Sequence, residues 1–419
     1  PLSAESAAQR ACLRQEGETE FFQLGAPDYT DLDRATVIYR TPGPDELCQN
    51  DDDVWRAVKL GMGAVDQPIA IVGTPVAPLH DVANGALRGW LLIHRVIENV
   101  NGSQQAVRKL ERVDADFANV VQIATLKDPA RLVARVPLQG AFAGDPLIAS
   151  GDELRRFDVR TNQLSVPLTL VVADARELLV VADATHAYVV RNGFGLEDVL
   201  KVPLNASVPA QLMDRVEGPI WDMQATPTHL VYRAWDGSVR AAAKVAPYLP
   251  NVRRNLAEGD EARMSRSGES IALTGRALPT NGQAERTFTA LVEAAGSGLL
   301  SNTQLIGHAH ALPGLRVDGV RGRPLLAEGI NANGSGYVDL AGASIASYDS
   351  DLSANKLVLG NLPRSGVEVS GLSANAGYGQ LVTLTAVALD RATGARHFDL
   401  YLAEADKAGT LTRVTSNIP

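Results

Sequence analysis

The chain has 419 residues, 45% of them apolar and 21% charged, which is typical of a folded globular protein and argues against a disordered one. Its 48 acidic residues outnumber its 39 basic ones, and no basic stripe is present, so we expect neither nucleic acid nor anionic membrane as a partner. No apolar run approaches the roughly 20 residues of a membrane-spanning helix, so membrane insertion is not expected.

The N-terminal segment, residues 1–16, is expected to precede a main domain at 17–419, with a short helix at 4–13. It lacks a charged region followed by an apolar one, so we expect any export signal to be absent already. The only two cysteines are Cys12 and Cys48, and we predict a disulfide between them because a thiol in the polar loop around Cys48 would be exposed. The bridge predicts a periplasmic or extracellular location; two free thiols in a cytosolic protein are the alternative.

An acidic loop at 41–55 interrupts the first predicted hairpin. It places four aspartates within nine positions: Asp45, Asp51, Asp52 and Asp53. Calcium takes roughly six to eight oxygen ligands in a flexible arrangement, so we predict a calcium site here, with calcium as the only cofactor. The spacing is not that of an EF-hand, and a solvated acidic loop held by the disulfide is the alternative.

Strand-like runs recur along the rest of the chain, each a polar turn followed by apolar residues. Their spacing, roughly 50 residues, is that of four-stranded propeller blades. We therefore predict an all-β fold, a single closed β-propeller of seven or eight four-stranded blades. Barrels and strings of sandwiches are the alternatives. The runs are residues 31–41, 84–95, 128–138, 174–183, 225–237, 265–275, 321–334 and 377–390.

Two segments resemble the blades of TolB-type and related WD-repeat-like propellers. SRSGESIAL at 265–273 is similar to the turn and apolar strand that open such blades, with Arg266 at the place of the usual proline. FDLYLAEADKAGTLTRVTSN at 398–417 is similar to their ending. The resemblance implies the fold and, by analogy, a protein-binding role, and it brings no catalytic residue.

The last 39 residues predict three strands, at 381–389, around 398–402 and at 410–414. We expect this stretch to close the ring by pairing with a strand near residues 20–24. A hairpin turn accounts for ALDRATGARHF at 388–398, with Gly394 at a positive-φ position. FDVRTNQ at 157–163 predicts the same kind of turn, with Asn162 in the glycine role.

Catalytic signatures are scarce. His308 and His310 would lie on one side of a strand, but a zinc site needs at least three protein ligands, so surface or channel-lining histidines are the preferred interpretation. The chain lacks a G-x-S-x-G elbow, an H-E-x-x-H pair and a phosphate-binding loop. We therefore expect an extracytoplasmic, non-enzymatic propeller that binds or scaffolds another protein. The alternatives are an enzyme using the central channel (a metal-assisted hydrolase or lyase, or an oxidoreductase) and a structural subunit of a cell-surface assembly.

Overall fold

A computed structural model provides the structure of the chain. It describes residues 23–25, 36–41, 54–59, 65–71, 74–81, 87–100, 102–137, 140–171, 178–192, 195–253, 263–267, 270–276, 287–293, 309–311, 316–317, 325–328, 331–332, 338–339, 342–347, 357–362, 368–376, 381–389, 396–404, 408–409 and 411–413. Every regular element among these residues is a strand. Accordingly, this part of the chain contains no helix that could span a membrane. The helix expected at 4–13 lies outside it.

The described strands form eight sheets of four or five strands and one two-stranded hairpin. The first sheet contains β1 (Gln23–Gly25), β2 (Thr36–Thr41), β3 (Val54–Lys59) and β4 (Val65–Pro68). The second contains β5 (Thr74–His80), β6 (Leu87–Val100), β7 (Ser103–Asp114) and β8 (Val120–Lys127). The third contains β9 (Ala130–Arg135), β10 (Pro146–Ser150), β11 (Glu153–Asp158), β12 (Gln163–Leu164) and β13 (Thr169–Leu170). The fourth contains β14 (Val180–Ala182), β15 (His186–Asn192), β16 (Leu196–Pro203) and β17 (Gln211–Glu217).

The remaining sheets continue in chain order. The fifth contains β18 (Ile220–Ala225), β19 (His229–Ala234), β20 (Val239–Ala243) and β21 (Pro250–Arg253). The sixth contains β22 (Arg263–Ser267), β23 (Ser270–Arg276), β24 (Thr287–Glu293) and β26 (Arg316–Val317). The seventh contains β25 (Ala309–Ala311), β27 (Leu325–Glu328), β30 (Ser344–Ser347) and β31 (Leu357–Asn361), and β28 (Asn331–Ala332) with β29 (Val338–Asp339) makes the hairpin. The eighth contains β32 (Glu368–Ala376), β33 (Leu381–Leu389), β34 (Arg396–Glu404) and β35 (Thr412–Arg413).

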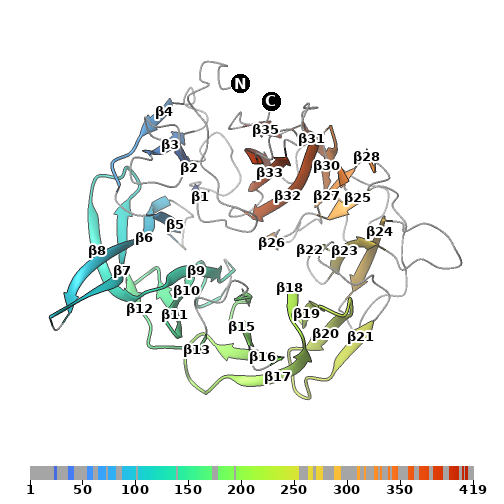
Figure 1. Cartoon of the computed structure of the whole chain (residues 1–419), viewed down its shortest axis with the longest axis horizontal. Coiled ribbons are helices and arrows are strands. Elements are labelled where there is room, and N and C mark those ends of the chain that lie inside the picture. The colour runs from blue at the N-terminus through green and yellow to red at the C-terminus, as the bar shows by residue number, and fades with distance from the viewer. Residues whose placement is uncertain are drawn as a thin grey trace, which may run out of the picture.

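The sheets are arranged in chain order around a common centre (Figure 1). The first strands of successive sheets contact one another, β1 with β5, β5 with β9, β9 with β14, β14 with β18 and β18 with β22. Nearly all neighbouring strands are antiparallel, and β22 with β26 is a parallel pair. This propeller-like arrangement confirms the all-β prediction.

The apolar core lies between neighbouring sheets. Leu147 and Ala149 of β10 pack in a cluster shared with the fourth sheet, whereas Ile148, between them, packs in a cluster shared with the second. Tyr188 of β15 likewise packs against the fifth sheet, on the opposite face from Val189. Because both faces of these sheets are covered, their strands are apolar at consecutive positions instead of alternating.

The C-terminal strands match the prediction closely. The strand predicted at 381–389 is β33, which pairs antiparallel with β34, and β34 pairs with β35. The predicted pairing with residues 20–24 is not found among the described residues. Gln23 and Leu24 lie in β1 and pair with Ile38 and Val37 of β2 instead, because the C-terminal segment itself supplies the four described strands of the last sheet.

Candidate functional site

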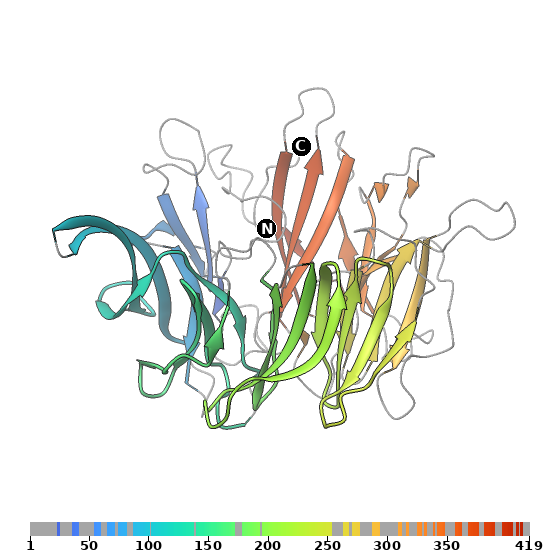
Figure 2. The ribbon, with the colours of Figure 1, turned by 60° about the horizontal axis from the view of Figure 1, so that its bottom comes forward.

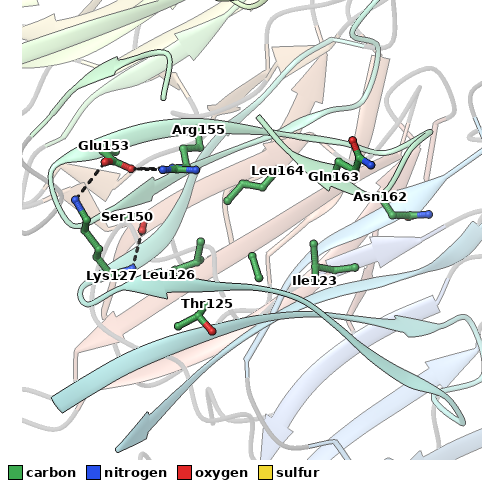
Figure 3. A pocket seen from close by; sticks show the side chains of 11 residues that line it. Ile123, Thr125, Leu126, Lys127, Ser150, Glu153, Arg155, Asn162, Gln163 and Leu164 are labelled. Atoms are coloured by element: carbon green, nitrogen blue, oxygen red, sulfur yellow. Dashed lines mark hydrogen bonds and ion pairs between the residues drawn. The ribbon is translucent and has the colours of Figure 1, made fainter. Parts of the chain in front are cut away.

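A groove opens between the second and third sheets (Figure 3). One wall is β8, the edge strand of the second sheet, and the other comes from β11, β12 and the turns beside them. Its volume is about 430 Å³, which is enough for one or two side chains of a partner. The lining consists of residues 123–127 together with Ser150, Glu153, Arg155, Asn162, Gln163 and Leu164.

The middle of the groove is apolar. Leu126 of β8 is buried in a cluster with Phe157 of β11, and Leu164 packs against the same cluster. Ile123 falls where the pairing of β7 with β8 shifts register, since Leu110 pairs with Ala124 but Glu111 pairs with Gln122. Such a bulge redirects a side chain, and here it brings Ile123 into the groove wall.

Ion pairs form one end of the groove. The Lys127 ammonium lies 2.9 Å from Asp152 and 3.2 Å from Glu153, and Arg155 donates to Glu153 at 2.8 Å. Hydrogen bonding from Arg155 and Lys127 lowers the pKa of Glu153, and hydrogen bonding to Asp152 and Glu153 raises the pKa of Lys127. These four charges cancel, so this end is polar but carries no net charge.

The opposite end carries amide side chains. Asn162 and Gln163 line it, and Figure 3 shows them away from the ion pairs, with Leu164 and Ile123 in between. Asn162 has a φ of 55°, and its N–H donates to the carbonyl of Asp158 at 2.9 Å. This confirms the prediction that Asn162 takes the glycine role in the 157–163 turn.

The outer edge of β8 presents backbone groups toward the groove. The Lys127 N–H donates to Ser150 Oγ at 2.9 Å, so it points away from β7. Backbone groups alternate in direction along a strand, and the N–H of Thr125, two residues earlier, therefore points to the same edge. Beyond the bulge, Val120 and Val121 are 47% and 55% exposed. The edge thus offers hydrogen-bonding groups beside apolar surface.

A long two-stranded ribbon flanks the charged end. Beyond its pairing with β5, which ends at Ile93, β6 continues to Val100, and β7 begins before β8 joins it at Val107. Figures 1 and 2 both show this ribbon projecting outward from the rest of the molecule. Ile97 on it is 66% exposed. The turn at its tip contains Gly102.

A second polar cluster lies between the fourth and fifth sheets, around Asp183 in the turn after β14. One carboxylate oxygen accepts from Tyr188 Oη at 2.7 Å and from Lys244 Nζ at 2.8 Å. The other accepts from the backbone of Thr185 and His186 at 2.9 and 2.8 Å. Burial raises the pKa of Asp183, but Lys244 and these hydrogen bonds outweigh it and hold that pKa well below its usual range.

Lys244 joins two equivalent turns. It follows β20 in the fifth sheet, where its backbone N–H donates to Thr228 at 2.9 Å, while its side chain reaches Asp183 in the fourth. In both turns a threonine Oγ1 lies 2.8 Å from Nδ1 of the following histidine, Thr185 with His186 and Thr228 with His229. Because both carboxylate oxygens of Asp183 already accept hydrogen bonds, we interpret this cluster as a structural contact that stabilises the packing of the fourth sheet against the fifth.

The site residues predicted from sequence lie mostly outside the described residues. This applies to the disulfide cysteines and to His308. His310 is in β25, where it pairs with Ala327 of β27, and its side chain is not described. Within the described part of the chain, no three His, Cys, Asp or Glu side chains are placed to hold a metal ion. The calcium aspartates Asp45, Asp51, Asp52 and Asp53 are also outside it.

The groove was not predicted. Its walls come from residues about 30 positions apart in two sheets, and the run VVQIATLK at 120–127 was not among the recurrent strands noted above. One signal did exist, the Asn101-Gly102 pair, which is typical of a tight hairpin turn. Val100 pairs with Ser103 across that turn, and it marks the tip of the ribbon.

No protein-family model and no curated protein matches the chain. Among solved structures it is similar to a chain of the mitotic checkpoint complex, at 12% identity and a TM-score of 0.40, over 74% of this chain and 87% of that one. It is also similar to the dihydro-heme d1 dehydrogenase NirN, at 11% identity and a TM-score of 0.42, over 93% of this chain and 74% of that one. A third similar structure is TolB from Acinetobacter baumannii, at 11% identity and a TM-score of 0.31, over 79% of this chain and 77% of that one. At such identities the likeness concerns the fold alone.

Proposed function

We propose that this chain is a non-enzymatic propeller that binds another protein, and that the groove beside β8 receives an extended segment of the partner. The observation that carries the proposal is the open edge of β8 lying beside a groove that is apolar in the middle and polar at both ends. A strand added to a sheet edge gains main-chain hydrogen bonds, and pockets beside it select the side chains. The Thr125 N–H would supply the hydrogen bond, and Leu126, Ile123 and Leu164 the pocket.

The proposal includes one closed ring in which the eight sheets are eight blades. The successive contacts of the first strands and the position of the core between neighbouring sheets support this arrangement. A closed ring would hold β8 and β12 at a fixed separation. Recognition residues on a rigid scaffold lose little entropy when the partner binds.

Thr125→Pro tests the strand addition. Proline removes the outward N–H without removing a hydrogen bond to β7, which is the strand position where proline is tolerated. We expect peptides selected on the wild-type protein from a phage-displayed random library to bind this variant about tenfold more weakly or worse. Affinity would be measured by isothermal titration calorimetry.

Thr125→Ala is the matched control. It removes the hydroxyl that accepts from Lys109 Nζ at 3.0 Å but keeps the backbone N–H, so selected peptides should bind it as they bind the wild type. Equal binding of the peptides to the proline variant, with unchanged circular dichroism, would refute strand addition at β8.

The location and the metal belong to the same proposal and are supported by sequence alone. We propose that the protein is extracytoplasmic, with a Cys12–Cys48 disulfide, and that Asp45, Asp51, Asp52 and Asp53 hold calcium. Calcium added to chelated protein should raise the thermal midpoint, because a ligand that binds only the folded state stabilises it. Mass spectrometry of unreduced peptides should recover the two cysteines linked; two free thiols would remove the argument for export.

A further inference from the structure

One face of the fourth sheet gathers basic and aromatic side chains where the fifth sheet covers it. Tyr188 of β15 lies directly opposite Lys201 of β16, and Lys201 lies opposite Gln211 of β17. His186 is two residues from Tyr188 on the same strand, so both rings lie on this face, with their centroids 6.5 Å apart. Because Tyr188 packs in the cluster shared with the fifth sheet, this is the face that the fifth sheet covers.

Two residues that follow β20 in the fifth sheet complete the contact. The Lys244 ammonium lies 5.0 Å from the centre of the Tyr188 ring. Tyr248 Oη donates to Gln211 Oε1 at 2.6 Å. In the other direction, Lys201 Nζ donates to the carbonyl of Lys244 at 2.6 Å and lies 5.7 Å from the centre of the Tyr248 ring. We define the junction as Asp183, His186, Tyr188, Lys201 and Gln211 of the fourth sheet with Lys244 and Tyr248 of the fifth.

Basic groups outnumber carboxylates in the junction. Lys244 pairs with Asp183 at 2.8 Å. Within the described part of the chain neither Lys201 nor His186 forms an ion pair with a carboxylate, since Lys201 contacts a carbonyl and a ring, and His186 contacts a hydroxyl. With His186 neutral, the junction holds two cations and one anion. A proton on His186 would make three cations, and like charges repel more strongly where they are partly buried.

Thr185 determines which nitrogen of His186 would take up that proton. The Thr185 hydroxyl donates to Asp183 Oδ1 at 3.0 Å, so it accepts from Nδ1 of His186, which is 2.8 Å away. Neutral His186 therefore carries its hydrogen on Nδ1, and acidification would add the second one at Nε2.

The surroundings of His186 disfavour its charged form. Burial lowers the pKa of His186 most, and the charge on Lys201 lowers it next; Lys244 lowers it as well, while the Asp183 carboxylate opposes them. The closed junction thus binds this proton less tightly than an opened junction does. By linkage, opening is favoured as pH falls through about 6.5, the ordinary pKa of histidine.

We propose that the junction is an acid-sensitive contact between the fourth and fifth sheets, which protonation of His186 beside Lys201 and Lys244 weakens. The inference is independent of the proposed function, because the junction shares no residue with the groove beside β8.

The segment that opening would release is the loop at 245–249. Lys244 immediately precedes it and Tyr248 lies within it, so junction contacts hold the loop against the fourth sheet. The loop contains no charged residue, and Val245 and Leu249 in it are 76% and 75% exposed. Exposed apolar surface of this kind is where partners dock, and acidification would change how the loop presents it.

The first test is a proton NMR titration of the His186 ring, whose signal is assigned by its absence from His186→Asn. In the wild type the midpoint should lie below about pH 6.5. It should shift upward in Lys201→Met, which removes the neighbouring cation and keeps the apolar stem beside Tyr248. Lys109→Met, at a lysine of β7 in the second sheet, is the matched control and should leave the midpoint unchanged.

The second test is hydrogen exchange followed by mass spectrometry at pH 7.5 and pH 5.5, with exposure times adjusted for the intrinsic rate at each pH. In the wild type, segments 183–190 and 244–253 should lose protection at pH 5.5, while β6 and β7 keep theirs. His186→Asn should retain protection in both segments at both pH values, because asparagine does not titrate.

Three results would overturn the inference. One is a His186 midpoint at or above about pH 6.5 in the wild type. Another is a midpoint that Lys201→Met does not raise. The last is the same loss of protection on acidification in His186→Asn as in the wild type. If His186→Asn does not fold, Lys201→Met replaces it in the exchange measurement, and its loss of protection at pH 5.5 should be smaller than that of the wild type.

Discussion

Asp183→Asn is expected to lower the free energy of unfolding by about 3 kcal/mol. Removing one partner of a buried ion pair costs about 3–5 kcal/mol, and the low end applies because the Asp183 side chain is 24% exposed. The substitution takes the carboxylate charge from the Lys244 ammonium, whose side chain is only 7% exposed. Urea unfolding followed by circular dichroism would measure the loss, with Asp152→Asn, in an exposed pair, as the control expected to change little.

A double-mutant cycle separates this pair from its surroundings. Lys244→Met keeps much of the buried stem and removes the charge, while Asp183 retains its hydrogen bonds from Tyr188, Thr185 and His186. We therefore expect a smaller loss than for Asp183→Asn. The double variant should be less destabilised than the sum of the two, because the residues are in contact. If the two losses simply added, Lys244 and Asp183 would not stabilise the protein through their mutual contact, and the structural role of this ion pair would be contradicted.

Acidification should remove the stabilisation that the ionised Asp183 carboxylate gives to the folded protein. Because the pKa of Asp183 is lower in the folded protein than in the unfolded chain, the unfolded chain takes up the proton first, and stability falls as pH falls below about 4. The Asp183 charge also favours the protonated form of His186, so the difference in stability between wild type and Asp183→Asn should be constant only above about pH 7, where this histidine is neutral, and should shrink below about pH 4. A difference that grows below about pH 4 would show that the carboxylate is not stabilised in the folded state.

The recurring turn-and-strand runs predicted the sheets well, but they did not predict whether a run would contain the first or the second strand of its sheet. Each of the eight runs falls in a different one of the eight sheets. The runs at 31–41, 84–95 and 225–237 contain second strands, β2, β6 and β19, whereas those at 128–138 and 174–183 contain first strands, β9 and β14. A polar turn precedes the first and the second strand alike, so the pattern marks a sheet without marking the position of the strand within it.

The groove beside β8 shows why a recurring strand pattern does not predict a binding site that lies between two sheets. Its ion pairs join Lys127 of one sheet to Asp152 and Glu153 of the next. Nothing in the local sequence specifies that two edges will lie side by side, because their separation is set by packing between sheets. The turn at Asn162 was predictable for the opposite reason, since its conformation depends on a few neighbouring residues.

Gly89→Ala is expected to be among the most damaging single substitutions in the described part of the chain. A Cβ atom at this position would lie 2.1 Å from the carbonyl oxygen of Val113 in the neighbouring strand β7, and the φ of Gly89 is +153°. A backbone carbonyl cannot rotate away as a side chain can, so the two longest strands of the second sheet would have to separate. We expect a loss of about 4 kcal/mol or more, measured by urea unfolding or, if the variant does not fold, by loss of soluble protein.

Gly102→Ala is the matched control at the other end of the same β6–β7 hairpin. Its φ is +83°, but a Cβ atom there would meet nothing within 4 Å, so only the backbone preference should be lost, about 1 kcal/mol. A comparable loss in both variants would show that backbone conformation, and not the Val113 contact, requires glycine at 89. The register of β5 against β6 shifts near this point, between Leu79 and His80. A glycine inside an apolar strand is typical of such a place, where another backbone approaches too closely for any side chain.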